Sequence, residues 1–408
     1  MKTLVLAGRL IDGTGAPARD GAGVVFEDEA IAYVGSERGA RTACPRPDEE
    51  IDARDGAVVP GLIDGHCHVV GAWEEMDPHR PGYRERLVLW GAGAAQAALA
   101  AGVTTLGDCG APDDSSLLLR DAIASGHLTG PRLVVCGPSL TTTAGHGDYL
   151  GIAALADNAD ELRRQVRRWV RAGIDFVKVM ATGGSADPPS NRRRAQYTVE
   201  ELTPAVADAH RLRRRVVAHC NATEGIRHSV EAGVDVIAHC NWLGCEEGVV
   251  EYDDAVARRM GKQGTMVDLN GGGLIQLVPG EGRVQGWHDA GLPARRWDMI
   301  EHMRRAHGVR VYLTTDALGP KIAGFPAVLT RFAREADVGP TDVLQMATQL
   351  PAIGIGVGER VGTLEVGKLA DLVVLAGDPS ADPSAFGRAR LVVKGGRVVA
   401  RDGRLAPG

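Results

Sequence analysis

Two histidines separated by one residue stand at the end of an apolar stretch, GLIDGHCHVV, at residues 61–70. Side chains alternate between the two faces of a β-strand, so His66 and His68 are expected to point in the same direction. Two neutral imidazoles spaced in this way can hold one cation, and nitrogen ligands suit zinc and similar metals. The pair therefore predicts a metal site, with Cys67 turned away from it.

Four further side chains that can bind a metal or titrate occupy comparable places later in the chain. Lys178 lies within an apolar run, His219 and His239 end two valine-rich runs, and Asp316 follows a third. A single histidine at a strand end usually has an ordinary hydrogen bond in the core. That explanation is much harder to apply to five strand ends at once, so we interpret the set as one site.

Lys178 is the most informative of these residues. An ammonium group inside a buried strand loses its hydration, so it must pair with an acid, lose its proton or be modified. Pairing with Asp175 is one solution. Beside a divalent cation, the other solution is reaction of the neutral amine with carbon dioxide, which gives an anionic carbamate able to bridge two metals. Two such ions with a carbamate, Asp316 and a hydroxide leave a charge of roughly +1, suited to stabilising an oxyanion.

The middle of the chain repeats a pattern in which a helical segment ends in glycine and leads into a β-rich run. AAGVTTLGD at 100–108 and EAGVDVIAHC at 231–240 are examples, and glycine is typical of helix C-termini. Eight such runs are apolar throughout, as expected of strands covered on both faces. We predict an α/β fold, a (β/α)8 TIM barrel over residues 58–358, with the active site at the carboxyl ends of the strands. A doubly wound sheet is the alternative.

The two ends of the chain resemble each other and differ from the middle. Residues 2–35 and 362–404 are short alternating strands broken by Gly, Asp and Pro, which is typical of small β-domains. We predict that residues 1–57 and 359–408 form one composite β-sandwich domain, with the barrel inserted between them. Two unrelated flanking hairpins are the alternative.

Composition narrows the class of function. The 408 residues carry a net charge of −6, with 44% hydrophobic and 24% charged residues, which gives no electrostatic case for binding nucleic acid or an acidic membrane. No apolar stretch reaches the roughly 18 residues needed to cross a bilayer. Seven cysteines without regular spacing indicate reduced thiols. We expect a cytoplasmic protein that acts on a small molecule, and the sequence leaves homo-oligomerisation open.

The motifs GLIDGHCH, FVKVMATGG, AHCNATEGIR, DVIAHC and LTTDA follow one another along the chain and resemble those of the amidohydrolase superfamily. FVKVMATGG and GPSLTTTAGHG at 137–147 are similar in particular to its branch with imidazolonepropionase-related amidohydrolases and prolidase-like peptidases. The resemblance implies two divalent metal ions, with zinc as the default, held by His66, His68 and Asp316 on one side and by His219 and His239 on the other, and bridged by carbamylated Lys178.

The resemblance also implies a reaction. A hydroxide that bridges the metals would attack an amide or peptide C–N bond, while Asp316 orients it, accepts its proton and passes that proton to the leaving amine. The alternative is a deaminase or a cyclic amide or amidine hydrolase acting on a heterocycle, including a mononuclear one, although such relatives generally lack the lysine. An inactive scaffold is a third interpretation, but scaffolds usually lose ligands.

Substrate contacts are predicted in the loops after the strands. His146, in a glycine-flanked loop, would hydrogen-bond the substrate carbonyl or its oxyanion, unless it is only a structural loop residue. Arg194, in an arginine run, would bind a substrate carboxylate, unless the run is merely a solvated face. Tyr197 and Asn270 are further candidates for lining the pocket. The cysteines that follow three of the histidines are expected to be packing residues rather than ligands: Cys67, Cys220 and Cys240.

Overall fold

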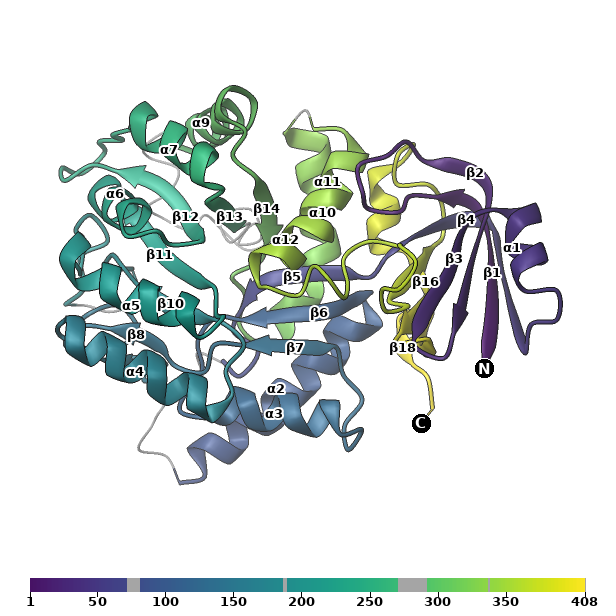
Figure 1. Cartoon of the computed structure of the whole chain (residues 1–408), viewed down its shortest axis with the longest axis horizontal. Coiled ribbons are helices and arrows are strands. Elements are labelled where there is room, and N and C mark those ends of the chain that lie inside the picture. The colour runs from purple at the N-terminus through teal and green to yellow at the C-terminus, as the bar shows by residue number, and fades with distance from the viewer. Residues whose placement is uncertain (72–80, 186–188, 271–291, 337, 408) are drawn as a thin grey trace, which may run out of the picture.

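The computed structural model describes residues 1–71, 81–185, 189–270, 292–336 and 338–407, without the side chains of 292–296. Strands from both ends of the chain form one sheet, at the right of Figure 1, and strands from the middle form two more, surrounded by helices at the left. Among the described residues, no helix has the length and apolar character that crossing a membrane requires.

Ten strands from the middle of the chain form two parallel sheets, ordered β5-β6-β7 and β14-β13-β12-β11-β10-β8-β9. Their side chains are almost all buried, as expected for parallel strands covered on both faces. The predicted α/β class is thus confirmed. The strands are β5 (Leu62–Cys67), β6 (Val103–Asp108), β7 (Arg132–Val135), β8 (Ser139–Thr141), β9 (Ala153–Leu155), β10 (Val177–Met180), β11 (Val216–Ala222), β12 (Val236–Leu243), β13 (Met266–Asn270) and β14 (Val311–Thr314).

Backbone hydrogen bonds join the two parallel sheets at both of their junctions. The N–H of Asp175, just before β10, donates to the carbonyl of Val135 at the end of β7 (2.8 Å). Beyond β14, the N–H of Asp316 donates to the carbonyl of His66 (2.8 Å). Strand β5 therefore lies beside the segment that leaves β14, and β7 lies beside the segment that enters β10.

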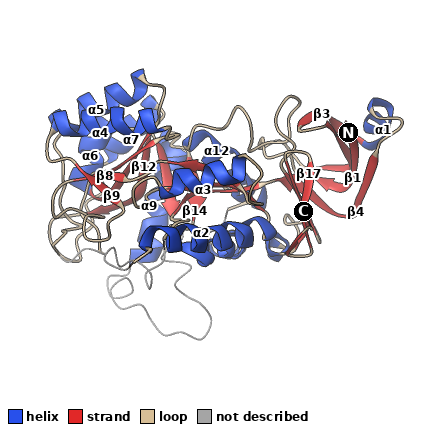
Figure 2. Cartoon of the chain, turned by 90° about the horizontal axis from the view of Figure 1, so that it is seen from below, coloured by secondary structure: helices blue, strands red, loops and turns tan. Residues whose placement is uncertain are grey.

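Helices cover the outer side of these strands (Figure 2). Outward side chains such as Val177 and Val179 pack with the helices, while Phe176 and Val217 form a separate cluster on the inner side. The helices are α2 (Tyr83–Ala100), α3 (Ser115–Ala124), α4 (Ala159–Ala172), α5 (Val199–Arg211), α6 (Thr223–Glu231), α7 (Asp254–Gln263), α9 (Leu292–His307), α10 (Phe325–Glu335), α11 (Pro340–Met346) and α12 (Gln349–Gly354), with the 3-10 helix η2 (Gly319–Gly324).

Both ends of the chain contribute to the third sheet, ordered β18-β17-β16-β15-β4-β1-β2-β3. Strand β4 pairs with β1 in parallel and with β15 in antiparallel orientation, and Val24 and Leu391 belong to one hydrophobic cluster. The elements at the two ends of the chain are β1 (Lys2–Leu10), β2 (Arg19–Glu27), β3 (Ala30–Ser36), α1 (Glu37–Ala43), β4 (Glu49–Pro60), β15 (Leu372–Leu375), the 3-10 helix η3 (Pro383–Gly387), β16 (Ala389–Lys394), β17 (Arg397–Arg401) and β18 (Arg404–Leu405). Strand β4 ends at Pro60, so it crosses the boundary that was expected at residue 57 between the terminal domain and the barrel.

Candidate metal centre and active site

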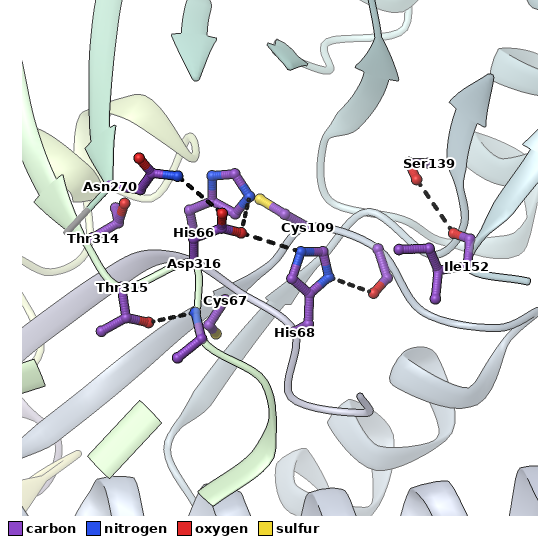
Figure 3. A network of polar contacts seen from close by, with 12 residues as sticks. His66, Cys67, His68, Cys109, Ser139, Ile152, Asn270, Thr314, Thr315 and Asp316 are labelled. Atoms are coloured by element: carbon purple, nitrogen blue, oxygen red, sulfur yellow. Dashed lines mark hydrogen bonds and ion pairs between the residues drawn. The ribbon is translucent and has the colours of Figure 1, made fainter. Parts of the chain in front are cut away.

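Side chains at the end of β5 and just beyond β14 meet in one cluster (Figure 3), and Lys178 of β10 lies against it. The Nε2 atom of His66 lies 3.1 Å from Nζ of Lys178 and 3.3 Å from Oδ1 of Asp316. The Nε2 atom of His68 lies 3.4 Å from the same carboxylate oxygen. One ligand atom from each of His66, His68 and Asp316 lies within 4.8 Å of the others, so these three residues can hold one metal ion.

Two more predicted ligands lie against this group. The ring centres of His219, on β11, and His239, on β12, are 4.3 Å apart, and His239 lies 5.5 Å from the ring of His66. The Nδ1 atom of His239 is 3.9 Å from Oδ2 of Asp316. The structure therefore brings all six predicted metal-binding residues together at the carboxyl ends of the parallel strands.

Lys178 is enclosed in this cluster, with only 1% of its surface exposed. Its expected alternative partner is occupied elsewhere, since Asp175 accepts hydrogen bonds from the Arg120 guanidinium (3.2 Å) and the Val135 N–H (2.9 Å). The lysine therefore faces a site histidine, and the Asp175 pairing is not observed.

His239 reaches the site through an unusual backbone. Ala238 packs on the inner side of the sheet, whereas Ile237 and Cys240 pack with the helices. Strict alternation would thus send His239 outward. Instead, φ is +68° at His239 and +51° at Cys240, which places two adjacent residues inside. A non-glycine residue in this left-handed region costs about 1–3 kcal/mol, so the fold accepts strain where it delivers this ligand.

The protonation states of His219, His239 and Asp316 suit metal binding. Burial, followed by the charges of His239 and His146, puts the pKa of His219 well below its usual range. Burial also lowers the pKa of His239 to about 3. For Asp316, burial acts to raise the pKa, but the charge of His66 and the hydrogen bond from His68 outweigh it and lower the pKa strongly. Neutral imidazoles and an ionised carboxylate are the forms that bind cations.

A buried acid that the sequence analysis missed supports the first histidine. Asp268, on β13, contacts Nδ1 of His66 and accepts a hydrogen bond from the Thr314 hydroxyl (2.5 Å). Burial acts to raise the pKa of Asp268, but the charge and hydrogen bond of His66 outweigh this and lower it. Metal-binding histidines commonly give their second ring nitrogen to a carboxylate, which fixes the ring and its tautomer. The sequence offers one weak signal for it, since Asp268 shares a strand face with Asn270.

Asp268→Asn is expected to weaken metal binding by about 10- to 100-fold, because it removes the charge that holds the His66 ring. The dissociation constant of the metal, from competition with a chelator, measures this. The matched control is Asp175→Asn, which removes a carboxylate near the opposite end of β10 and should leave metal affinity unchanged. Equal affinity in Asp268→Asn and the wild type would contradict the role of Asp268.

Two of the predicted substrate-contacting residues lie at the cluster. The ring centre of His146 is 4.5 Å from that of His219. Its loop approaches closely because Gly184 has no side chain, since a Cβ there would lie 2.3 Å from Nδ1 of His146. The Asn270 amide contacts a ring nitrogen of His239 and donates to Oδ2 of Asp316 (2.9 Å).

Arg194 and Tyr197 lie differently from the prediction. The exposed Arg194 guanidinium contacts Sγ of Cys245 (2.9 Å). The Tyr197 ring is buried in the helix-facing cluster and its hydroxyl donates to the carbonyl of Ala156 (2.7 Å). These contacts favour structural roles in place of the substrate contacts expected from the sequence.

The cysteines beside the histidines are packing residues. Cys67, Cys220 and Cys240 all belong to the helix-facing cluster. The Cys220 thiol lies 3.6 Å from the carbonyl of Gly225, and burial raises its pKa to about 12. A thiol that stays protonated and points outward cannot serve as a ligand in this centre.

Comparison with known proteins agrees with this geometry. A model of the amidohydrolase family matches residues 57–399. The chain belongs to the amidohydrolase family. It is 28% identical to ochratoxinase of Aspergillus niger, over 97% of this chain and 86% of the relative. It is also 28% identical to imidazolonepropionase of Symbiobacterium thermophilum, over 98% of each chain.

Solved structures of family members have the same fold. A crystal structure of a Xaa-Pro dipeptidase with methionine bound in its active site covers 98% of this chain and 99% of its own, with 25% identity and a TM-score of 0.82. Family membership and these relatives identify the chain as an enzyme, a hydrolase acting on C–N bonds. The relatives are named for different substrates, so the family alone does not fix the substrate of this member.

Proposed function

We propose that this amidohydrolase cleaves an amide or peptide bond with two divalent metal ions, zinc by default, and a carbamate on Lys178 between them. The observation that carries the proposal is the position of Lys178. It is 1% exposed and lies 3.1 Å from Nε2 of His66, where an ammonium next to bound cations would be strongly disfavoured. The neutral amine would add to carbon dioxide, forming an N–C bond and releasing one proton, and so become an anionic ligand.

The donor set fits two ions of the zinc class. It consists of four imidazoles, one carboxylate and the modified lysine, with His66, His68 and Asp316 on one side and His219 and His239 on the other. The low pKa values of His219 and His239 leave their nitrogen lone pairs free at neutral pH. When bound, the ions supply Lewis acidity to the scissile carbonyl and lower the pKa of a water molecule.

The protein side chains then have distinct tasks. Asp316 takes the proton of the attacking water and returns it to the leaving amine, which requires a carboxylate within hydrogen-bond reach. Asn270 holds Oδ2 of Asp316 (2.9 Å) and so fixes the plane of the carboxylate. His146, beside His219, donates a hydrogen bond to the developing oxyanion.

The proposal extends to the architecture around the site. We infer that eight of the ten parallel strands, all except the short β8 and β9, close a (β/α)8 barrel over residues 58–358. Residues 1–57 and 359–408 would then form the second domain. The hydrogen bonds from Asp175 to Val135 and from Asp316 to His66 support closure. In such a barrel the site lies at the carboxyl ends of the strands, where loops vary in sequence and set specificity.

Metal analysis with a hydrolysis screen tests the proposal. After weakly held ions are removed, we expect two metal ions per chain and, with ¹³C-bicarbonate, a carbamate signal that Lys178→Ala abolishes. Dipeptides and N-acyl amino acids should be cleaved, in keeping with the ochratoxinase and dipeptidase relatives. One metal, an unmodified lysine and turnover of heterocycles would instead indicate the deaminase or cyclic amide hydrolase. A protein that cannot be loaded with metal would indicate an inactive scaffold.

A further inference from the structure

A second group of metal-binding side chains lies in the helix layer, outside the catalytic centre. Asp254 is the first residue of α7, and His302 and His307 lie in the last turns of α9. The two helices are neighbours at the upper left of Figure 1. None of these residues was predicted to be functional from the sequence, and they have no part in the proposed catalytic function.

The two imidazoles converge on a single oxygen. Nε2 of His302 lies 3.2 Å from Oδ1 of Asp254, and Nε2 of His307 lies 2.6 Å from the same atom. All three ligand atoms lie within 4.8 Å of one another. Neighbouring ligands in a tetrahedral zinc site are about 3.3 Å apart. The distance from Asp254 to His302 thus matches this spacing, and the distance from Asp254 to His307 is about 0.7 Å shorter.

Contacts around these residues hold them in this orientation. The second oxygen of Asp254 accepts a hydrogen bond from Arg258 (2.8 Å). Tyr252 packs against the edge of the His302 ring (6.0 Å between centres), and its own ring is packed against Trp242 (5.1 Å). Such supporting contacts orient metal ligands in known sites.

An ordinary His–Asp pair elsewhere in the chain shows what distinguishes this cluster. His210 lies 2.8 Å from Oδ2 of Asp235, and no second imidazole approaches that carboxylate among the described residues. Asp254, in contrast, has two imidazole nitrogens on one oxygen, with the ring planes at 86°. The contact between His210 and Asp235 is explained by one shared proton. Asp254, His302 and His307, in contrast, are arranged as the ligands of one ion would be.

We propose that Asp254, His302 and His307 bind a third divalent metal ion of the zinc class. Two nitrogens and one oxygen are the ligand types that such ions prefer, and water would complete the coordination because the side chains of Asp254 and His302 are 42% and 52% exposed. The ion would join α7 to α9. These helices precede β13 and β14, the strands that lead to Asp268, Asn270 and Asp316.

Zinc binding by the full-length, metal-loaded protein tests the site. Zinc bound per chain is counted over a range of buffered free Zn²⁺ concentrations, together with the melting temperature. The wild type should take up one ion more than the His302→Ala/His307→Ala variant, and only the wild type should gain a few degrees of melting temperature at the concentration that fills the site. The control variant His210→Ala should behave as the wild type.

Asp254→Asn provides a second test that keeps both imidazoles. It should raise the dissociation constant of the extra ion at least about tenfold, the smallest loss seen when a supporting group alone is removed. Equal zinc uptake by the double variant and the wild type would overturn the proposal, as would the same loss in His210→Ala. The proposed function is tested separately, because Lys178→Ala affects the catalytic ions and leaves this site intact.

Discussion

Asp316→Asn is expected to lower kcat/KM by about 10³- to 10⁴-fold while the protein remains folded. The amide has nearly the same size and can still contact Asn270, so packing is kept. It carries no negative charge and cannot accept the proton of the attacking water, which removes general acid–base catalysis and weakens a metal ligand. Steady-state kinetics on the best substrate of the screen, with circular dichroism and metal content, measures the effect.

A buried carboxylate on a neighbouring strand provides the control for this change. Asp108, on β6, accepts the N–H of Val69 (2.8 Å), an interaction that the amide oxygen of asparagine can also make. Asp108→Asn should keep most of the activity. Activity in Asp316→Asn comparable to that of Asp108→Asn would refute the acid–base role of Asp316.

Lys178→Ala is expected to abolish nearly all activity, and short-chain carboxylates should restore part of it. Truncation would remove the proposed bridging carbamate and leave a buried space beside His66, which a small carboxylate could enter with a similar pair of oxygens. Initial rates measured against increasing acetate or propionate concentration should rise and then saturate, with metal content rising in parallel.

The matched variant for Lys178→Ala is Lys178→Arg, which fills the same space with a permanently charged guanidinium. It should be inactive and should not respond to added carboxylate. Normal activity of Lys178→Ala without additives would exclude the carbamate.

The clustering of the proposed metal ligands could be predicted from the sequence because most of them obey strand alternation. Phe176, just before β10, and Lys178, on β10, both face inward, two residues apart, as the pattern requires. His239 was also predicted, from its place at a strand end, but alternation alone would have turned it outward. Its left-handed φ of +68° cannot be inferred from composition or periodicity, because only a few per cent of non-glycine residues adopt a positive φ.

The positions of Arg194, Tyr197 and Asp268 were not foreseen, and the three cases have a common physical cause. Arg194 and Tyr197 were assigned by chemical type within a loop, and whether such a side chain meets substrate or protein depends on contacts with distant segments. Arg194 meets Cys245, and Tyr197 meets Ala156. Asp268 was missed because a single acid inside a strand becomes meaningful only when its histidine partner, more than 200 residues earlier in the chain, is known. Such long-range pairings arise from the fold and not from local pattern.

The junction between β4 and β5 links the chain termini to the metal centre. Only Gly61 separates these strands, and β15 pairs with β4 at Ala57–Pro60, six residues before His66. Fraying of β15 would release the end of β4, one residue before the strand that carries His66. We therefore expect faster amide exchange in β4 to accompany loss of metal, and a truncation that removes β15 to weaken the proposed metal centre.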